Sequence, residues 1–210
     1  MKETPILFST AMVQAIIAGQ KTQTRRTRGL EIINQNPDNY LFYVMGGNKK
    51  EVCFKIISME KYTYIKCPFG QVGDLLWVRE SFTHIFDVKT PRNGWVVYKA
   101  DDSCKKITKW KPSIHMPKAA ARIWLKIIDI RVERLHNISE EDAINEGVKI
   151  GESIQKQVNL YYNYESELFN FQQAKASFKS LWISINGNDS WIKNPWVWVI
   201  EFKLSNKAGK

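Results

Sequence analysis

Apolar positions recur at helical spacing in three parts of the chain. The first lies between Thr10, a residue type suited to cap a helix, and Gly19, a type suited to end one in the left-handed conformation. The second begins with a serine followed three residues later by an aspartate, the spacing of a capping box. The third is the longest, and its apolar stripe is spaced to pack on a sheet. The predicted helices span residues 11–18, 139–147 and 165–185.

Other segments have the patterns of strands. The predicted strands span residues 52–58, 74–80, 95–99, 121–135 and 196–204. In the fourth strand the apolar positions change parity near Ile128, which predicts a bulge or bend there. Residues 19–28 and 34–50 are polar and are interpreted as loops. Because short strands outnumber helices without regular alternation, the pattern favours an α+β fold, a small mixed β-barrel with attached helices, over a doubly wound sheet.

Length and composition indicate one ordinary soluble domain. The 210 residues are 44% hydrophobic and 25% charged, which argues against a disordered or collagenous chain. No run approaches the roughly 18 apolar residues that a membrane span needs, and no signal peptide is evident, so we expect a cytoplasmic protein without a membrane partner. Cys53, Cys67 and Cys104 are odd in number and widely spaced, which predicts free thiols in a reducing compartment.

The charge balance points to polyanionic partners. Lys and Arg number 31 against 21 Asp and Glu, a formal net charge of +10, which suits binding to RNA or nucleotides. Eight tryptophans add stacking surfaces, and Trp110, which lies between two lysines, is the candidate for an exposed one. The chain has neither paired cysteine motifs nor phosphate-loop or dinucleotide signatures, and it has only three histidines. We therefore expect no cofactor and no metal, which excludes zinc-dependent deaminase chemistry.

A dense group of cations follows the first predicted helix. If Arg25 and Arg26 lie close to Lys21, their like charge lowers the pKa of the lysine toward that of a general base. Thr24 carries a hydroxyl that such a lysine can activate. The alternative interpretation is a solvated basic loop that binds phosphates.

Three further residues are candidates for the site. Glu146 lies at the C-terminal end of the second predicted helix, where the macrodipole disfavours an anion, and a proton-transfer role would explain it. The alternative is a tolerated carboxylate at an exposed helix end. Glu80, at the end of an apolar strand, is a candidate comparable with Glu146. The structural alternative for Glu80 is an ion pair with Arg79 or Arg122. His115 lies in a proline-bounded loop, where it either contacts substrate or hydrogen-bonds the backbone.

Four separate segments resemble the ASCH-domain family, the first through its G-x-K-T-x-T-x-R pattern. They cover residues 16–26, 71–80, 138–147 and 198–202. The resemblance implies one PUA-like β-barrel domain over residues 1–210, with insertions around 34–66 and 82–117. The whole chain also resembles longer ASCH proteins of phages, in which the segment 113–117 recurs.

The family resemblance implies an activity. Small bacterial members are amidohydrolases of N(4)-acetylcytidine, and their lysine, threonine and glutamate fall on Lys21, Thr24 and Glu146. The implied reaction is metal-independent removal of an acyl group from an N(4)-acylated cytosine nucleoside, with a lysine base, a threonine nucleophile and a glutamic acid. Direct attack by water, with Thr24 only orienting the amide, stays open, as do two other functions: an RNA-binding PUA-like module and a ribonuclease. The residues expected to bind substrate are Arg25, Arg26, Glu80 and His115.

Overall fold

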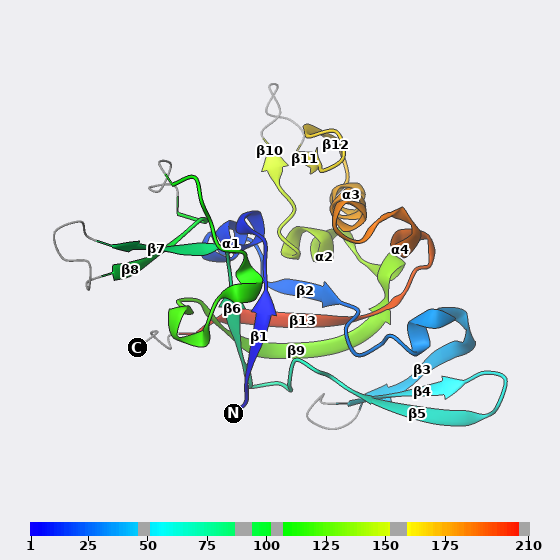
Figure 1. Ribbon diagram of the computed structural model, residues 1–210. Helices are drawn as coiled ribbons and strands as arrows, with labels where there is room; N and C mark the ends of the chain where they lie inside the picture. Colours follow the sequence, from blue (N-terminus) through cyan, green and yellow to red (C-terminus); the bar gives the residue numbers. More distant parts are fainter. Residues whose placement is uncertain (46–50, 87–93, 102–106, 152–158, 206–210) are drawn as a thin grey trace.

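The computed structural model describes residues 1–45, 51–86, 94–101, 107–151 and 159–205 (Figure 1). These residues combine helices with strands that pair into several sheets. The prediction of an α+β fold is therefore confirmed. No helix among the described residues has the length and apolar character required to cross a bilayer.

The central sheet has five strands in the order β1-β6-β9-β13-β2. Its members are β1 (Glu3–Leu7), β6 (Leu75–Arg79), β9 (Trp124–Arg134), β13 (Trp196–Leu204) and β2 (Gln23–Arg26). β1 pairs with β6 in parallel, and the other neighbours are antiparallel. Within the described residues no ladder joins β1 to β2, so the sheet is open rather than a closed barrel.

The long β9–β13 ladder contains the bulge that the sequence predicts. Glu201 lies opposite Asp129 and Phe202 lies opposite Ile127, so Ile128 is the extra residue. Its side chain is exposed, whereas that of Ile127 is buried. An extra residue bends a strand and increases its twist, and β9 curves beneath β13 in Figure 1.

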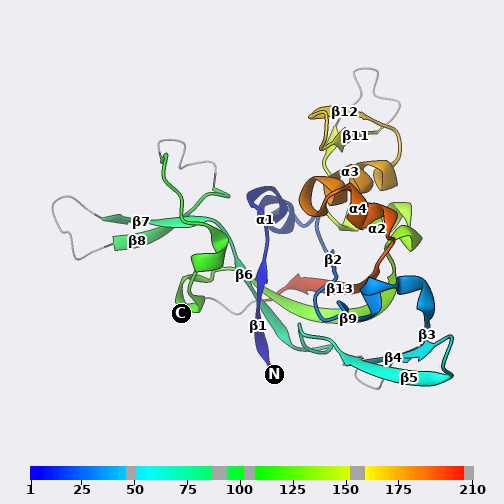
Figure 2. The same ribbon diagram turned by 45° about the vertical axis from the view of Figure 1, so that its right-hand side comes forward.

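Helices cover one side of the central sheet, as both ribbon views show (Figure 2). They are α1 (Thr10–Ile17), α2 (Glu140–Asn145), α3 (Ala174–Asn186) and α4 (Asn188–Ile192). The prediction that Thr10 caps α1 is wrong by one residue, because the Ser9 hydroxyl accepts the Met12 amide at 3.4 Å. The capping box of α2 is confirmed, with Ser139 and Asp142 bonded reciprocally.

The longest helix is shorter than its sequence pattern predicts. Its first expected residues instead form a hairpin strand, and α3 begins at Ala174. The aromatic residues of this segment pair across the hairpin, and the ring centroids of Phe169 and Tyr162 lie 5.1 Å apart. The small sheet comprises β10 (Ile150–Gly151), β11 (Leu160–Asn163) and β12 (Leu168–Phe171).

Two more sheets project from the central one, in the two segments expected to be insertions (Figure 1). The first comprises β3 (Tyr40–Met45), β4 (Glu51–Ile56) and β5 (Lys61–Lys66), and the second comprises β7 (Phe82–Phe86) and β8 (Gly94–Tyr98). Reading residues 34–50 as one loop was therefore wrong, because β3 lies within that segment. Phe54 anchors the first sheet to the core, with its ring 5.0 Å from that of Trp196.

Two of the three cysteines lie among the described residues. Cys53 and Cys67 are buried free thiols, as predicted, while Cys104 falls outside the described residues. Burial raises the pKa of the Cys67 thiol to about 11. This thiol is therefore a weak nucleophile near neutral pH, and its position in the core is that of a packing residue.

Candidate active site

The basic segment expected to be a loop contains an edge strand. β2 pairs with β13, with Thr24 opposite Ile200 and Arg26 opposite Trp198. Thr24 and Arg26 share one face of β2 because side chains alternate along a strand. The interpretation of residues 19–28 as a loop was therefore wrong for Gln23–Arg26. These residues are polar, and the apolar strand that buries them, β13, is distant in sequence.

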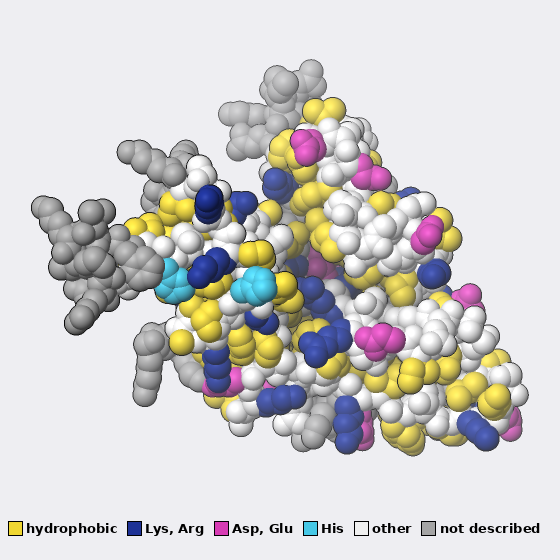
Figure 3. Space-filling view, viewed as in Figure 1, with side chains coloured by type: hydrophobic (Ala, Val, Ile, Leu, Met, Phe, Trp, Pro, Cys, Tyr) yellow, Lys and Arg dark blue, Asp and Glu magenta, His cyan; other side chains and the backbone are white. Residues whose placement is uncertain are grey.

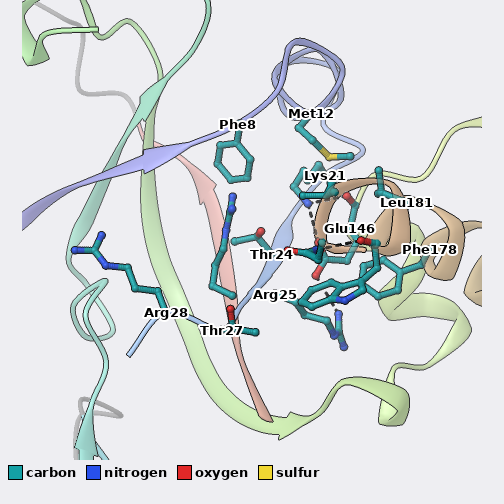
Figure 4. Close-up of a pocket in the computed structure, with 14 residues that line it drawn as sticks. Phe8, Met12, Lys21, Thr24, Arg25, Thr27, Arg28, Glu146, Phe178 and Leu181 are labelled. Atoms are coloured by element: carbon teal, nitrogen blue, oxygen red, sulfur yellow. Dashed lines mark hydrogen bonds and ion pairs between the residues drawn. The ribbon is translucent and has the colours of Figure 1, made fainter. Parts of the chain in front are cut away.

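Beside this strand lies a pocket of about 250 Å³. Its polar part is formed by Lys21, Thr24, Arg25, Arg26 and Glu146. Its apolar part includes Phe8, Met12, Phe178, Leu181 and Trp182. In Figure 4, Phe8 lies on one side of the polar group, and Phe178 and Leu181 lie on the other. The structure thus brings five of the seven predicted site residues together.

Lys21 and Glu146 form a buried pair at the centre of this pocket (Figure 4). The Lys21 Nζ donates to Glu146 Oε2 at 2.8 Å and to the backbone carbonyl of the same residue at 2.6 Å. The pairing links the segment after α1 to the end of α2, 125 residues away in sequence. Gly147, with φ of +80°, makes room for it, because a Cβ there would lie 2.9 Å from Lys21 Cβ.

The environment lowers the pKa of Lys21 below its ordinary value of 10.5. Burial is the largest cause, and the positive charges of Arg26 and Arg25 act in the same direction. The attraction of Glu146 opposes them without reversing the shift. The sequence predicts the direction from neighbouring charges alone, and the structure adds desolvation as the larger effect.

Arg25 fixes the carboxylate of Glu146 from the other side. Its Nη1 donates to Glu146 Oε1 at 3.1 Å, and its Nη2 donates to Asp142 Oδ2 at 3.0 Å and also to Glu133. The guanidinium is fully buried. Since both terminal nitrogens bond to protein carboxylates, Arg25 orients Glu146, and its direct contact with substrate stays a prediction.

A second layer of polar residues holds Arg25 in place beside Glu146. Sequence reasoning did not identify these residues as part of the site. Asp142 accepts from Gln23 Nε2 at 3.0 Å and from Arg131 Nη2 at 2.8 Å. Burial alone would raise the pKa of Asp142, but the bond from Gln23 and the charges of Arg25 and Arg131 lower it. Asp142 therefore stays ionised and holds Arg25 in place. Its capping pattern was the only sequence signal, and that pattern indicates a helix start rather than a site.

Arg26 also faces the pocket, but its environment differs from that of Arg25. Its guanidinium carbon lies 5.1 Å from the centre of the Phe8 ring, and Nη2 donates to the Leu7 carbonyl at 2.7 Å. Among the described residues no carboxylate forms an ion pair with Arg26, and its buried Nε has no hydrogen-bond acceptor.

Glu80 and His115 are not brought to the pocket. The buried Glu80 accepts two bonds from Arg122, at 2.8 and 3.0 Å, so the structural alternative considered from sequence is the arrangement observed. Arg122 also bonds both carboxylate oxygens of Asp101. His115 is exposed at the end of the short turn Ser113–His115. A substrate contact by either residue stays a prediction.

The apolar walls were assigned only to packing in the sequence analysis. Phe178, Leu181 and Trp182 are spaced to cover a sheet, and they do so, but they also line the pocket. A helical apolar stripe carries no signal that separates a core position from a pocket wall. No group of His, Cys, Asp or Glu side chains suited to hold a metal ion occurs among the described residues.

Comparisons of the chain with protein-family models, curated proteins and solved structures give no match.

Proposed function

We propose that this protein is an amidohydrolase that removes the acyl group from N(4)-acetylcytidine or a related N(4)-acylated cytosine nucleoside. The observation that carries the proposal is the meeting of Lys21, Thr24 and Glu146 in one pocket, with Lys21 and Glu146 bonded at 2.8 Å. A lysine with a lowered pKa, a buried hydroxyl and a carboxylate are the groups that acyl transfer requires.

Acylation uses Lys21 as the base and Glu146 as the acid. Transfer of a proton within the bonded pair leaves a neutral amine on Lys21 and a protonated Glu146. The amine takes the Thr24 hydroxyl proton as the threonine oxygen attacks the acyl carbon. Protonated Glu146 then gives its proton to the exocyclic nitrogen as the C–N bond breaks, so cytidine leaves as a neutral amine. The product of this half-reaction is an acyl ester on Thr24.

Deacylation returns the pair to its starting state. The Glu146 carboxylate takes a proton from a water molecule that attacks the ester, and the Lys21 ammonium protonates the departing Thr24 oxygen. A carboxylic acid is released, and every proton is accounted for. Backbone amides of the segment 21–25 are the proposed donors to the oxyanion.

The size of the pocket suits a small substrate. Its volume of about 250 Å³ lies just below the range of about 300–1,000 Å³ that is usual for ligand sites. Phe8 and Trp182 supply aromatic surfaces on which a pyrimidine ring can stack. We also infer that the open central sheet corresponds to the PUA-like barrel implied by the motif resemblance and that the protein acts in the cytoplasm.

The direct test is incubation with N(4)-acetylcytidine, followed by the ultraviolet change to cytidine. The Lys21→Ala variant should lose at least about a thousandfold in rate, because both acid–base and nucleophilic steps depend on it. Lys203→Ala, which removes an exposed lysine from β13, is the matched control and should keep the wild-type rate. Turnover by Lys21→Ala at the wild-type rate would exclude this mechanism.

A second candidate function, RNA binding, is favoured by the sheet β3-β4-β5. Tyr43, Tyr62 and Tyr64 are 61%, 46% and 68% exposed there, and the rings of Tyr43 and Tyr62 lie 4.9 Å apart. Lys55 lies opposite Tyr62 in the strand register. Exposed aromatic rings beside cations suit stacking on single-stranded bases. Trp110, the predicted stacker, is half-buried, and its Nε1 donates to a backbone carbonyl, so its role stays a prediction.

A further inference from the structure

The pocket carries more positive charge than its own carboxylate can balance. Lys21, Arg25, Arg26 and Arg28 line it, while Glu146 is the one carboxylate among its described lining residues. Lys21 and Arg25 both bond to Glu146, and Arg25 has two further carboxylate partners outside the pocket. Figure 3 shows Lys and Arg side chains gathered around the hollow in the middle of the molecule.

Arg26 lines the pocket without a carboxylate partner among the described residues. One terminal nitrogen bonds to the Leu7 carbonyl, which is neutral, and the buried Nε has no acceptor within that part of the chain. Burial lowers the pKa of the Arg26 guanidinium, and Glu146 opposes this only from a distance that allows no ion pair. The Arg26 side chain is half-buried, and a partly desolvated cation without a counter-ion is unfavourable, so the arrangement is explained if a ligand supplies the anion.

The position of Arg26 relative to Thr24 limits where this anion sits. The two residues share one face of β2 and are two positions apart, a spacing of about 7 Å along a strand. A substrate whose acyl carbon lies at the Thr24 hydroxyl therefore reaches Arg26 with a group a few bonds away. Arg28 lines the outer edge of the pocket and turns away from Lys21, which extends the positive charge toward solvent (Figure 4).

We propose that Arg26 forms an anion-binding subsite and that the substrate is a negatively charged N(4)-acylcytosine compound rather than a neutral nucleoside. A planar guanidinium binds phosphate or carboxylate through two parallel hydrogen bonds, so the anion is either a nucleotide phosphate or a carboxylate on the acyl group. The identity of the reaction rests on the proposed amidohydrolase function, whereas the anion subsite does not.

A binding experiment tests the subsite without any turnover. Cytidine 5′-monophosphate, cytidine, succinate and inorganic phosphate are titrated calorimetrically into the wild-type protein, Arg26→Gln and Arg26→Lys. The monophosphate should bind at least about tenfold more tightly than cytidine, as expected for one charge-assisted bond, and Arg26→Gln should remove the difference. Lys203→Gln removes one exposed charge far from Arg26 in sequence and should keep the difference in affinity between the monophosphate and cytidine. If only phosphate or succinate binds at Arg26, the result selects one source of the anion.

A kinetic experiment distinguishes the two sources and separates this inference from the proposed function. The substrates are N(4)-acetylcytidine, its 5′-monophosphate and N(4)-succinylcytidine, and the readout is kcat/KM for each variant. A tenfold preference for the monophosphate or the succinyl compound, lost in Arg26→Gln, supports the subsite and names the source.

The remaining outcomes are also decisive. Hydrolysis of all three substrates at equal efficiency, with equal binding of cytidine and its monophosphate, overturns the anion subsite and leaves the amidohydrolase intact. Absence of hydrolysis, with monophosphate binding that depends on Arg26, overturns the proposed reaction and leaves the subsite. If Arg26→Gln does not fold, as shown by circular dichroism, the wild-type comparison of charged and neutral ligands still decides.

Discussion

Replacing Gly147 by Ala tests whether the end of α2 positions Lys21, the proposed catalytic base. The new Cβ would lie 2.9 Å from Lys21 Cβ and 3.1 Å from Ala15 Cβ, below ordinary contact distance. The left-handed backbone adds about 1–2 kcal/mol of strain, and overpacking adds about 1–3 kcal/mol. Gly73 is the matched control, because its φ is +93° but its Cβ would meet nothing within 4 Å. Gly73→Ala therefore carries the strain without the contact.

The two variants should differ in both stability and rate. Gly147→Ala should unfold with a free energy about 1–3 kcal/mol lower than Gly73→Ala, a difference in Tm of roughly 2–12 °C. Relief of the contact displaces Lys21 by about half an ångström, and a displacement of about 1 Å costs on the order of a hundredfold in rate. We expect kcat to fall by about tenfold in Gly147→Ala alone. Equal Tm values and equal rates in the two variants would refute the positioning argument.

Two further predictions concern the same pocket, and a third concerns the sheet β3-β4-β5. The proposed reactive pair holds one proton between Lys21 and Glu146, and loss of that proton to solvent removes the acid that the leaving nitrogen needs. Because the pKa of Lys21 lies below 10.5, kcat/KM should fall on the alkaline side of a pH–rate profile before pH 10.5 is reached. A fall centred at or above 10.5 would contradict the lowered pKa. Lys21→Ala and Thr24→Ala should not be additive, so the double variant should be no slower than the slower single one, and additive losses would mean independent roles. Nucleoside turnover should vary little with salt, whereas the affinity for RNA bound through four phosphates should fall with salt at a log–log slope of about −3. Tyr62→Ala should weaken this RNA affinity and leave the slope unchanged. An RNA affinity that does not depend on salt would exclude binding of this kind.

The fold could be predicted where apolar spacing is the dominant signal. The last strand and the bulge at Ile128 come directly from alternation and its change of parity. The strand β2 could not be found in this way, since its polar residues are buried by a partner about 170 positions away. The prediction of a helix was also wrong for the first part of the segment 165–185, because aromatic residues pack in a hairpin as well as on a helix face.

The candidate site shows a similar division. Lys21 and Glu146 stood out in sequence because each carries a charge in a position that disfavours it, and the structure places them in contact. Glu133 and Asp142 hold Arg25 through ion pairs that form only when the chain folds. Local sequence does not indicate which carboxylates come to surround Arg25. The apolar walls of the pocket could not be predicted either, because local sequence does not distinguish a core position from a pocket wall.

The pairing of β2 with β13 has a consequence for the order in which the protein becomes functional. Thr24 is synthesised roughly 170 residues before its described ladder partner, Trp196–Leu204. At a translation rate of about 5–20 residues per second, the strand that bears Thr24 waits roughly nine to thirty-five seconds for its partner. During that interval β2 lacks the strand that it pairs with in the described residues, and the pocket beside it is incomplete. We therefore expect the pocket to form only when β13 docks.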